Sequence, residues 1–246
     1  MPSPTTVELL WGIRERPKRG PKPALTLAGI VAEAIALADA EGLASLSMQR
    51  LAERLGYTKM SLYRYVPAKE QLTALMLDTA LGAPPELLEA QPDSPRPWRE
   101  CLRQWAVTLF ARYNEHPWAL DLAVGVRPMG PNELSWLEVA LVALEGTGLT
   151  GPERLDTVVL INGHIRSLAQ QSLGSTGGQL AEQVARQFEE MFAVAGAGYP
   201  AVRAAFAEEA AAAHRTGASD NTDDALRFGI GRILDGLAVL IAERAG

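Results

Sequence analysis

The sequence predicts an all-α protein in two parts: an N-terminal three-helix domain with a helix-turn-helix, and a larger C-terminal helical domain. Apolar residues recur at spacings of three and four through most of the 246 residues, which is the period of an α-helix. The strict alternation that marks a half-buried strand occurs nowhere in the sequence. A proline-rich stretch, residues 83–97, separates the two helical regions and is expected to be a linker.

The composition limits the kind of protein that this chain can be. Hydrophobic residues make up 48% of it, which is enough for a core. No apolar run approaches the roughly 20 residues of a membrane span, and the N-terminus lacks the apolar core of a signal peptide. A single cysteine, Cys101, excludes an internal disulfide and a cysteine-rich zinc site. We therefore expect a cytoplasmic protein.

Charge is distributed unequally along the chain, whose net charge is −6. Residues 1–77 hold 10 Lys and Arg against 7 Asp and Glu, whereas residues 78–246 hold 13 against 22. A basic head on an acidic body directs the head towards phosphate and keeps the body away from it.

Residues 1–25 are expected to form a flexible basic arm. Five prolines interrupt this stretch, and basic residues cluster between Arg14 and Lys22. Residues Thr6–Ile13 could form one short helical turn, and Trp11 could dock on an unidentified surface. Two roles stay open for the basic run: a contact to the minor groove or to phosphates, and a solvated tail.

The N-terminal domain is expected to hold helices over residues 26–41, 47–55, 58–66 and 69–81. Thr26 and Ser47 are candidate N-caps for the first two helices. Gly42 ends the first, and Gly56 supplies the left-handed residue that ends the second. Pro67 breaks the chain before the fourth helix, which is expected to connect this domain to the C-terminal one.

The helix over residues 58–66 is unusually polar. Only Met60, Leu62 and Val66 can hold it to a core, so its exposed face is expected to carry its function. A helix, a glycine-containing turn and a polar second helix form the helix-turn-helix pattern, whose second helix enters the major groove of DNA.

The segment LAERLGYTKMSLYRYVPAKEQL closely resembles the DNA-binding signature of the TetR family of bacterial transcriptional repressors. The resemblance is specific over about residues 24–81 and looser over the C-terminal part. It implies a DNA-binding domain at residues 26–82 and a ligand-binding and dimerisation domain at residues 98–246.

The resemblance and the side-chain chemistry together predict a set of DNA contacts. Short or planar polar groups at the start of the second helix suit base edges, and Lys59 reaches a phosphate or a guanine. Lys69 begins the next helix, where free backbone N–H groups favour a phosphate. The predicted contacts are Ser47, Gln49, Thr58, Lys59, Ser61, Tyr63, Tyr65 and Lys69. Tyr63 could instead be a core ring, and Met60 could be either a core plug or a contact to a thymine methyl group.

The C-terminal domain is expected to hold helical segments over residues 98–115, 118–124, 133–144, 152–173, 179–194, 200–215 and 223–245. As the resemblance suggests, aromatic residues and one histidine could line an apolar ligand pocket. The predicted lining residues are Trp105, Phe110, Tyr113, Trp118, Trp136 and His164. The alternative is that these rings only pack a core, with His164 as a satisfied core histidine.

Two helices of this domain are expected to form a dimer interface, because the family pairs two such helices per subunit into a four-helix contact. The last helix is apolar on more than one face, and Gly229 and Gly236 allow a close approach. The predicted interface residues are Val158, Ile161, Ile165, Ile230, Ile233, Leu237 and Leu240. The alternative is that both helices serve only the core of one chain.

Together these patterns predict a ligand-responsive repressor that acts as a homodimer on double-stranded DNA, at an operator expected to be palindromic. A small apolar or aromatic molecule is expected to release it, and no cofactor or metal is expected. His116, His164 and His214 lack metal-ligand spacing, and no phosphate-binding glycine loop occurs. Two alternatives stay open: a DNA-binding regulator without an effector, and a cytoplasmic enzyme with an incidental helix-turn-helix.

Overall fold

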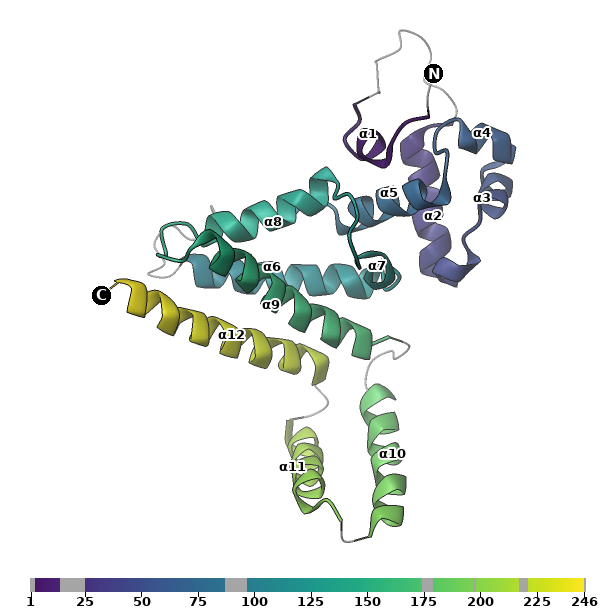
Figure 1. The fold of residues 1–246 in the computed structure, drawn as a ribbon. Helices are drawn as coiled ribbons and strands as arrows, with labels where there is room; N and C mark the ends of the chain where they lie inside the picture. The colour runs from purple at the N-terminus through teal and green to yellow at the C-terminus, as the bar shows by residue number, and fades with distance from the viewer. Residues whose placement is uncertain are drawn as a thin grey trace.

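The computed structural model describes residues 3–13, 25–86, 97–173, 179–196, 198–216 and 221–245 (Figure 1). Within these ranges every regular element is a helix, so the all-α prediction is confirmed. No helix among the described residues is long and apolar enough to span a membrane.

The N-terminal part is built from α1 (Thr6–Leu10), α2 (Leu27–Glu41), the 3-10 helix η1 (Leu43–Ser45), α3 (Met48–Leu55), α4 (Lys59–Tyr63) and α5 (Lys69–Leu81). Local chemistry sets the ends of α2. Thr26 Oγ1 accepts a hydrogen bond from Gly29 N at 3.0 Å, and Gly42 ends the helix with a φ of 80°. Helices α2, α3 and α4 meet around the fully buried side chains of Ile30, Leu51 and Leu62. These helices, from α2 to α4, form the head.

Helix α5 belongs to both parts of the molecule. It packs against α1 and α2 in the N-terminal part and against α6, α7 and α8 in the C-terminal part. Its side chains Leu72 and Met76 are fully buried. Helix α5 therefore connects the head to the C-terminal part.

The C-terminal body is built around α6 (Pro97–Glu115). Helices α7 (Ala119–Leu122), α8 (Pro131–Ala143), α9 (Gly151–Gln171) and α12 (Asn221–Ala245) complete it. Helix α6 packs against α8, α9 and α12 and is buried on more than one side. Helices α9 and α12 lie side by side and run in opposite directions along the body (Figure 1).

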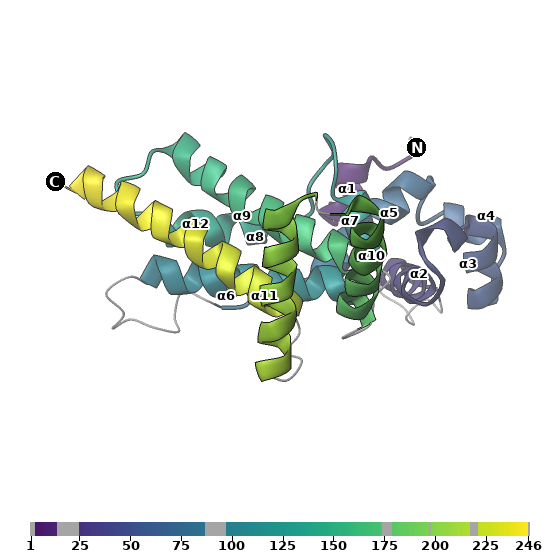
Figure 2. The same cartoon turned by 90° about the horizontal axis from the view of Figure 1, so that it is seen from below.

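Helices α10 (Gln179–Ala195) and α11 (Pro200–Thr216) form a hairpin that projects from the body, as Figure 1 shows from the side and Figure 2 from below. The rings of Phe188 and Phe206 lie 3.8 Å apart, centroid to centroid. Arg203 lies over the ring of Phe192 at 4.9 Å and donates a hydrogen bond to its carbonyl oxygen at 2.6 Å. These contacts join the two helices of the hairpin to each other.

Residues 3–13 of the predicted arm are folded, and the short helical turn predicted within Thr6–Ile13 is present as α1. Thr5 and Glu8 cap α1 reciprocally, and Leu10 is buried. Gln71 Nε2 donates to Pro4 O at 2.7 Å, and Trp11 Nε1 donates to Met129 O at 3.2 Å. Helix α1 thus lies on α5 and contacts the body, while the basic run between Arg14 and Lys22 lies outside the described residues.

The other predicted helices are present, with small differences at their ends. The largest difference is in α4, which stops at Tyr63 instead of continuing to Val66. Pro67 explains this, because the residue before a proline is disfavoured in the helical conformation. Most of the predicted linker, residues 87–96, lies outside the described residues.

Candidate nucleic-acid interface

The turn between α3 and α4 is fixed by caps that the sequence encodes. Ser47 Oγ accepts a hydrogen bond from Arg50 N at 3.2 Å and begins α3. Gly56 ends that helix in the left-handed region, with a φ of 74°. Thr58 Oγ1 accepts from Ser61 N at 3.3 Å and begins α4, and its oxygen lies 2.9 Å from Ser61 Oγ. The two helices are therefore held at a defined angle before any partner binds.

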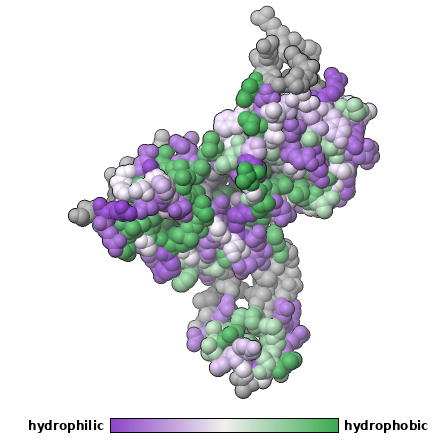
Figure 3. Space-filling view, in the orientation of Figure 1, coloured by the Kyte–Doolittle hydropathy of each residue, from purple (hydrophilic) through white to green (hydrophobic). Residues whose placement is uncertain are grey.

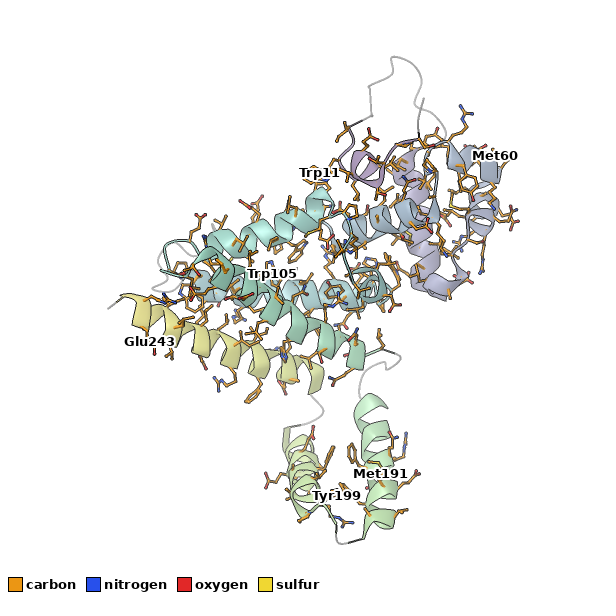
Figure 4. All side chains as sticks on the ribbon, in the orientation of Figure 1. Trp11, Met60, Trp105, Met191, Tyr199 and Glu243 are labelled. Atoms are coloured by element: carbon orange, nitrogen blue, oxygen red, sulfur yellow. The ribbon has the colours of Figure 1, made fainter. Side chains whose placement is uncertain are left out.

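Helix α4 is anchored on one side only. Leu62 and the following Val66 are fully buried in the head. Lys59, at the start of the helix, is exposed, and its ammonium lies 5.5 Å from the centre of the ring of Tyr63, which is half-buried against the core. Met60 is 72% exposed and projects at the outer edge of the head (Figure 4), so it is not a core plug.

Two predicted DNA contacts are already engaged inside the head. The Tyr65 hydroxyl donates to Leu25 O at 2.9 Å, and Lys69 Nζ donates to Leu46 O at 2.7 Å. Tyr65 has no second proton to donate to a phosphate, so its prediction as a phosphate donor is wrong. Lys69 keeps two further N–H donors, and it begins α5 as predicted.

The other polar residues of α3 are tied to acidic neighbours. Gln49 Nε2 donates to Glu53 Oε1 at 2.6 Å within the helix. Arg50 pairs with Glu41 and Arg54 with Glu33, each at 2.5 Å. These pairs leave the exposed face of α4 as the surface best suited to meet DNA.

Asp39 of α2 joins the head to the body. Its Oδ1 accepts from Trp118 Nε1 at 2.6 Å and lies 2.8 Å from His116 Nδ1, within hydrogen-bonding distance. Trp118 is buried in this contact, and its ring is tilted against that of His116, 5.6 Å away. The structure therefore places Trp118 at the junction with the head, which corrects its prediction as a ligand-pocket residue.

Asp78 of α5 forms a second junction. It is 6% exposed and accepts hydrogen bonds from Glu133 N at 3.0 Å and from Asn132 Nδ2 at 3.2 Å, at the start of α8. Burial raises the pKa of this carboxyl above 3.8, while those hydrogen bonds act in the opposite direction. A Cβ atom at Gly130 would lie 2.2 Å from the carboxylate, so only glycine fits beside it.

Two predicted ligand residues, Trp105 and Trp136, pack together, and Figure 4 shows Trp105 in the middle of the body. Their rings meet edge to face, with centroids 5.8 Å apart. Trp105 Nε1 donates to Trp136 O at 2.8 Å, and Trp136 Nε1 donates to Gly82 O at 2.9 Å, just after α5. Phe110 and Tyr113 are also buried on α6.

The ring of His164 on α9 faces α12 and not the pair of tryptophans. A Cβ atom at Gly229 would lie 2.0 Å from His164 Nε2, so the glycine makes room for the imidazole. That nitrogen is buried without a hydrogen-bond partner among the described residues. His164 is therefore not the satisfied core histidine of the alternative prediction.

Most of the predicted dimer-interface residues are buried in the core of the single protomer. Val158, Ile161, Ile165, Ile230 and Leu237 are buried, and Ile233 and Leu240 are half-buried. The exposed apolar residues of the same two helices are different ones: Leu155, Val159 and Leu160 on α9, and Phe228 and Val239 on α12. Hydrophobic side chains gather over this part of the body in Figure 3. The predicted helices are thus available for dimerisation, but through other faces.

The sequence left the role of Met60 open, and Asp39 and Asp78 were not included in the predicted site. Met60 could have been placed from helical geometry, because it lies two residues from the buried Leu62 and so on the other side of the helix. Asp78 could have been noticed as a carboxylate among the apolar residues of α5. Asp39 carries no comparable signal, because its partners are 77 and 79 residues away.

Two family models of bacterial regulatory proteins match the chain, one over its N-terminal part and one over its C-terminal part. The family model described as "Bacterial regulatory proteins, tetR family" matches residues 30–76, and "Tetracyclin repressor-like, C-terminal domain" matches residues 91–241. The HTH-type transcriptional repressor DrrR1 of Streptomyces coeruleorubidus is 39% identical over 247 residues, which cover 98% of this chain and 87% of that protein.

Solved structures extend the comparison to the fold. Apo ActR from Streptomyces coelicolor matches with a TM-score of 0.67 and 25% identity, over 91% of this chain and 99% of that one. ActR from the same organism in complex with actinorhodin matches with a TM-score of 0.64 and 26% identity, over 88% and 98% of the two chains.

Proposed function

The chain belongs to the TetR family of bacterial regulatory proteins, and on that premise we propose that a small ligand releases it from its operator DNA. It is a DNA-binding transcriptional repressor and not an enzyme. The proposal concerns how it binds DNA, what releases it and how the two events are coupled.

The observation that carries the proposal is the orientation of α4. Leu62 and Val66 hold one side of the helix in the head, Lys59 and Met60 are exposed, and Tyr63 is half-buried with part of its ring against the core. The exposed face enters the major groove, with Ser47, Gln49, Thr58 and Ser61 at its rim and Lys69 near a phosphate. Tyr65 supports the head from inside and makes no donor contact to DNA.

The repressor acts as a homodimer, because a single head offers few basic groups to phosphates. The exposed apolar residues of α9 and α12, with Val159 and Val239 at 69% and 60% exposure, form the contact with a second copy. Gly163 and Gly236 lie on the same helices, and a Cβ atom at either would meet nothing within 4 Å, which leaves room for a close approach. Two heads related by a two-fold axis fit a palindromic operator whose half-sites lie about 34–36 Å apart.

The ligand is small and apolar or aromatic, and it binds in the middle of the body. The proposed binding residues are Trp105, Phe110, Tyr113, Trp136 and His164. Two facts support this: the rings cluster on α6 and α8, and ActR, 26% identical, has been solved with actinorhodin. Entry must open the contact between the two indole rings, so the ligand favours a body conformation that differs from the described one.

Two junctions transmit that change to the head. Arg166 of α9 donates to Ala123 O at 2.6 Å and to Leu120 O at 3.0 Å, which ties α9 to α7. Trp118 precedes α7 and holds Asp39 of the head, while Asp78 of α5 holds the start of α8. Ligand-induced displacement of α7 or α8 thereby alters the orientation of the head.

One observation favours a second candidate, a regulator without an effector. Trp105 and Trp136 have both indole N–H groups satisfied by backbone carbonyls, as in an ordinary core. In that case the body only dimerises, and small apolar compounds leave DNA binding unchanged.

A binding experiment separates the two candidates. The probe is a labelled duplex from the DNA upstream of the gene, and the first compound to titrate is actinorhodin, followed by a panel of small apolar compounds. A ligand-responsive repressor releases the duplex and melts at a higher temperature with the active compound. If compounds raise the melting temperature but none of them releases the duplex, the result supports the regulator without an effector.

A further inference from the structure

Met60 has no packing role in the head. It is 72% exposed, and Figure 4 shows it pointing outward from α4. Successive helical residues are about 100° apart, so Met60 lies nearly opposite Leu62, which is fully buried. The orientation of Met60 is therefore set by the helix and does not depend on contacts of its own side chain.

The position of Met60 matters more than its exposure, since isolated exposed apolar side chains are common. It is the second residue of α4, and the first turn of a recognition helix is the part that meets base edges. The flanking hydroxyl groups of Thr58 and Ser61 lie 2.9 Å apart and engage each other. Lys59 is directed over the Tyr63 ring. Met60 is thus the apolar group that this turn presents to the groove.

Thymine is the base that presents a matching group. In the major groove each base pair offers hydrogen-bonding atoms, and the thymine C5-methyl is the apolar feature among them. A methionine side chain is flexible and polarisable, so it adapts to such a methyl group. We infer that Met60 packs on a thymine methyl in each operator half-site and selects T·A at that position, an assignment that rests on the proposed function.

The test removes one methyl group at a time from the DNA. The full chain first selects its operator from a random duplex pool, and each thymine of the operator is then replaced by uracil. Wild type should bind about fourfold more weakly when one position of a half-site is changed, because one buried methyl-sized group contributes roughly that factor. The other thymines should tolerate the change.

Two variants assign the effect to Met60. Met60→Ala should bind the thymine and the uracil operator equally, whereas Met60→Leu should keep most of the discrimination. Both variants should melt like wild type, because the side chain is exposed.

The outcomes that contradict the inference are distinct from those that contradict the proposed function. A selected operator that wild type binds equally at every uracil substitution overturns the role of Met60 alone. Discrimination that survives unchanged in Met60→Ala does the same. If the chain selects no sequence from the pool, the proposed function fails and this inference fails with it.

Discussion

Tyr63 and Tyr65 lie two residues apart and have separate roles. The Tyr65 hydroxyl donates to Leu25 O at 2.9 Å inside the head, whereas Tyr63 lies beside the exposed Lys59. Tyr65→Phe should lower the free energy of unfolding by about 1 kcal/mol and leave operator affinity unchanged, because a neutral hydrogen bond contributes roughly that much. Tyr63→Phe should weaken operator binding without changing stability. Urea unfolding and fluorescence anisotropy measure the two effects, and an exchange of the two results would show that the assignments are reversed.

Asp78 should make stability depend on pH in a predictable direction. Burial raises its pKa in the folded chain above 3.8, so the folded state binds this proton more readily than the unfolded state. Lowering the pH from 7 through the raised pKa should therefore stabilise wild type relative to Asp78→Asn. The gain is about 1.4 kcal/mol for each unit by which the pKa is raised, and it is lost again as the pH rises.

Urea unfolding of wild type and Asp78→Asn between pH 7 and pH 4 measures this difference. The Asn variant supplies the reference, because its side chain does not titrate. A difference that stays constant, or that turns against wild type at low pH, would mean that Asp78 has no raised pKa.

The exposed faces of α9 and α12 give a prediction about assembly. Val159→Asp and Val239→Asp should convert the dimer to folded monomers, because each places a charge in the proposed contact. Leu237→Asp should instead unfold the chain, because Leu237 is 8% exposed inside the protomer and an unpaired buried charge is costly. Val126→Asp, in an exposed loop, is the control. Sedimentation and melting report the results; dimeric Val159 and Val239 variants would place the interface elsewhere.

The helices themselves could be predicted from the sequence because their ends are encoded locally. Thr26 and Ser47 cap α2 and α3 as expected, and Gly56 ends α3. The buried faces could not be predicted equally well. Val159 and Ile161 are both apolar β-branched residues on α9, yet only Ile161 is buried, because α6 and α12 cover that side. Such packing depends on how distant helices cross, and the pattern of one helix does not contain it.

The same limit applied to the candidate site. The helix-turn-helix could be predicted from consecutive residues. The hydrogen bond that engages the Tyr65 hydroxyl is made to Leu25, 40 residues earlier. The hydrogen bond that places Trp118 at the junction is made to Asp39, 79 residues earlier. Neither partner could be identified from the local sequence.

At the scale of the whole molecule, Asp39 should contribute more to the free energy of unfolding than its partly exposed position suggests. Asp39→Ala removes the acceptor of the buried Trp118 indole and should cost about 1–3 kcal/mol, the usual penalty for an unsatisfied buried donor. Glu41→Ala, also on α2, breaks only exposed pairs with Arg50 and Arg54 and should cost less than about 1 kcal/mol. Unfolding followed by tryptophan fluorescence compares them. Equal losses would show that the junction adds nothing.

The division of charge between a basic N-terminal part and an acidic remainder also belongs to this scale. Each Lys59 that contacts a phosphate should contribute about 0.9 to the slope of log K against log salt concentration. The acidic body contributes no such contact, so substitutions there should leave the slope unchanged.

The most direct test of the account is the affinity of the full chain for the DNA upstream of its gene, compared with a scrambled duplex of equal length at physiological salt. The account predicts that the upstream site binds at least about 1,000-fold more tightly, with two chains per duplex, and that Lys59→Ala and Tyr63→Phe bind the upstream site more weakly than wild type. Equal affinity of wild type for the two duplexes, or undiminished affinity for the upstream site in both variants, would contradict it.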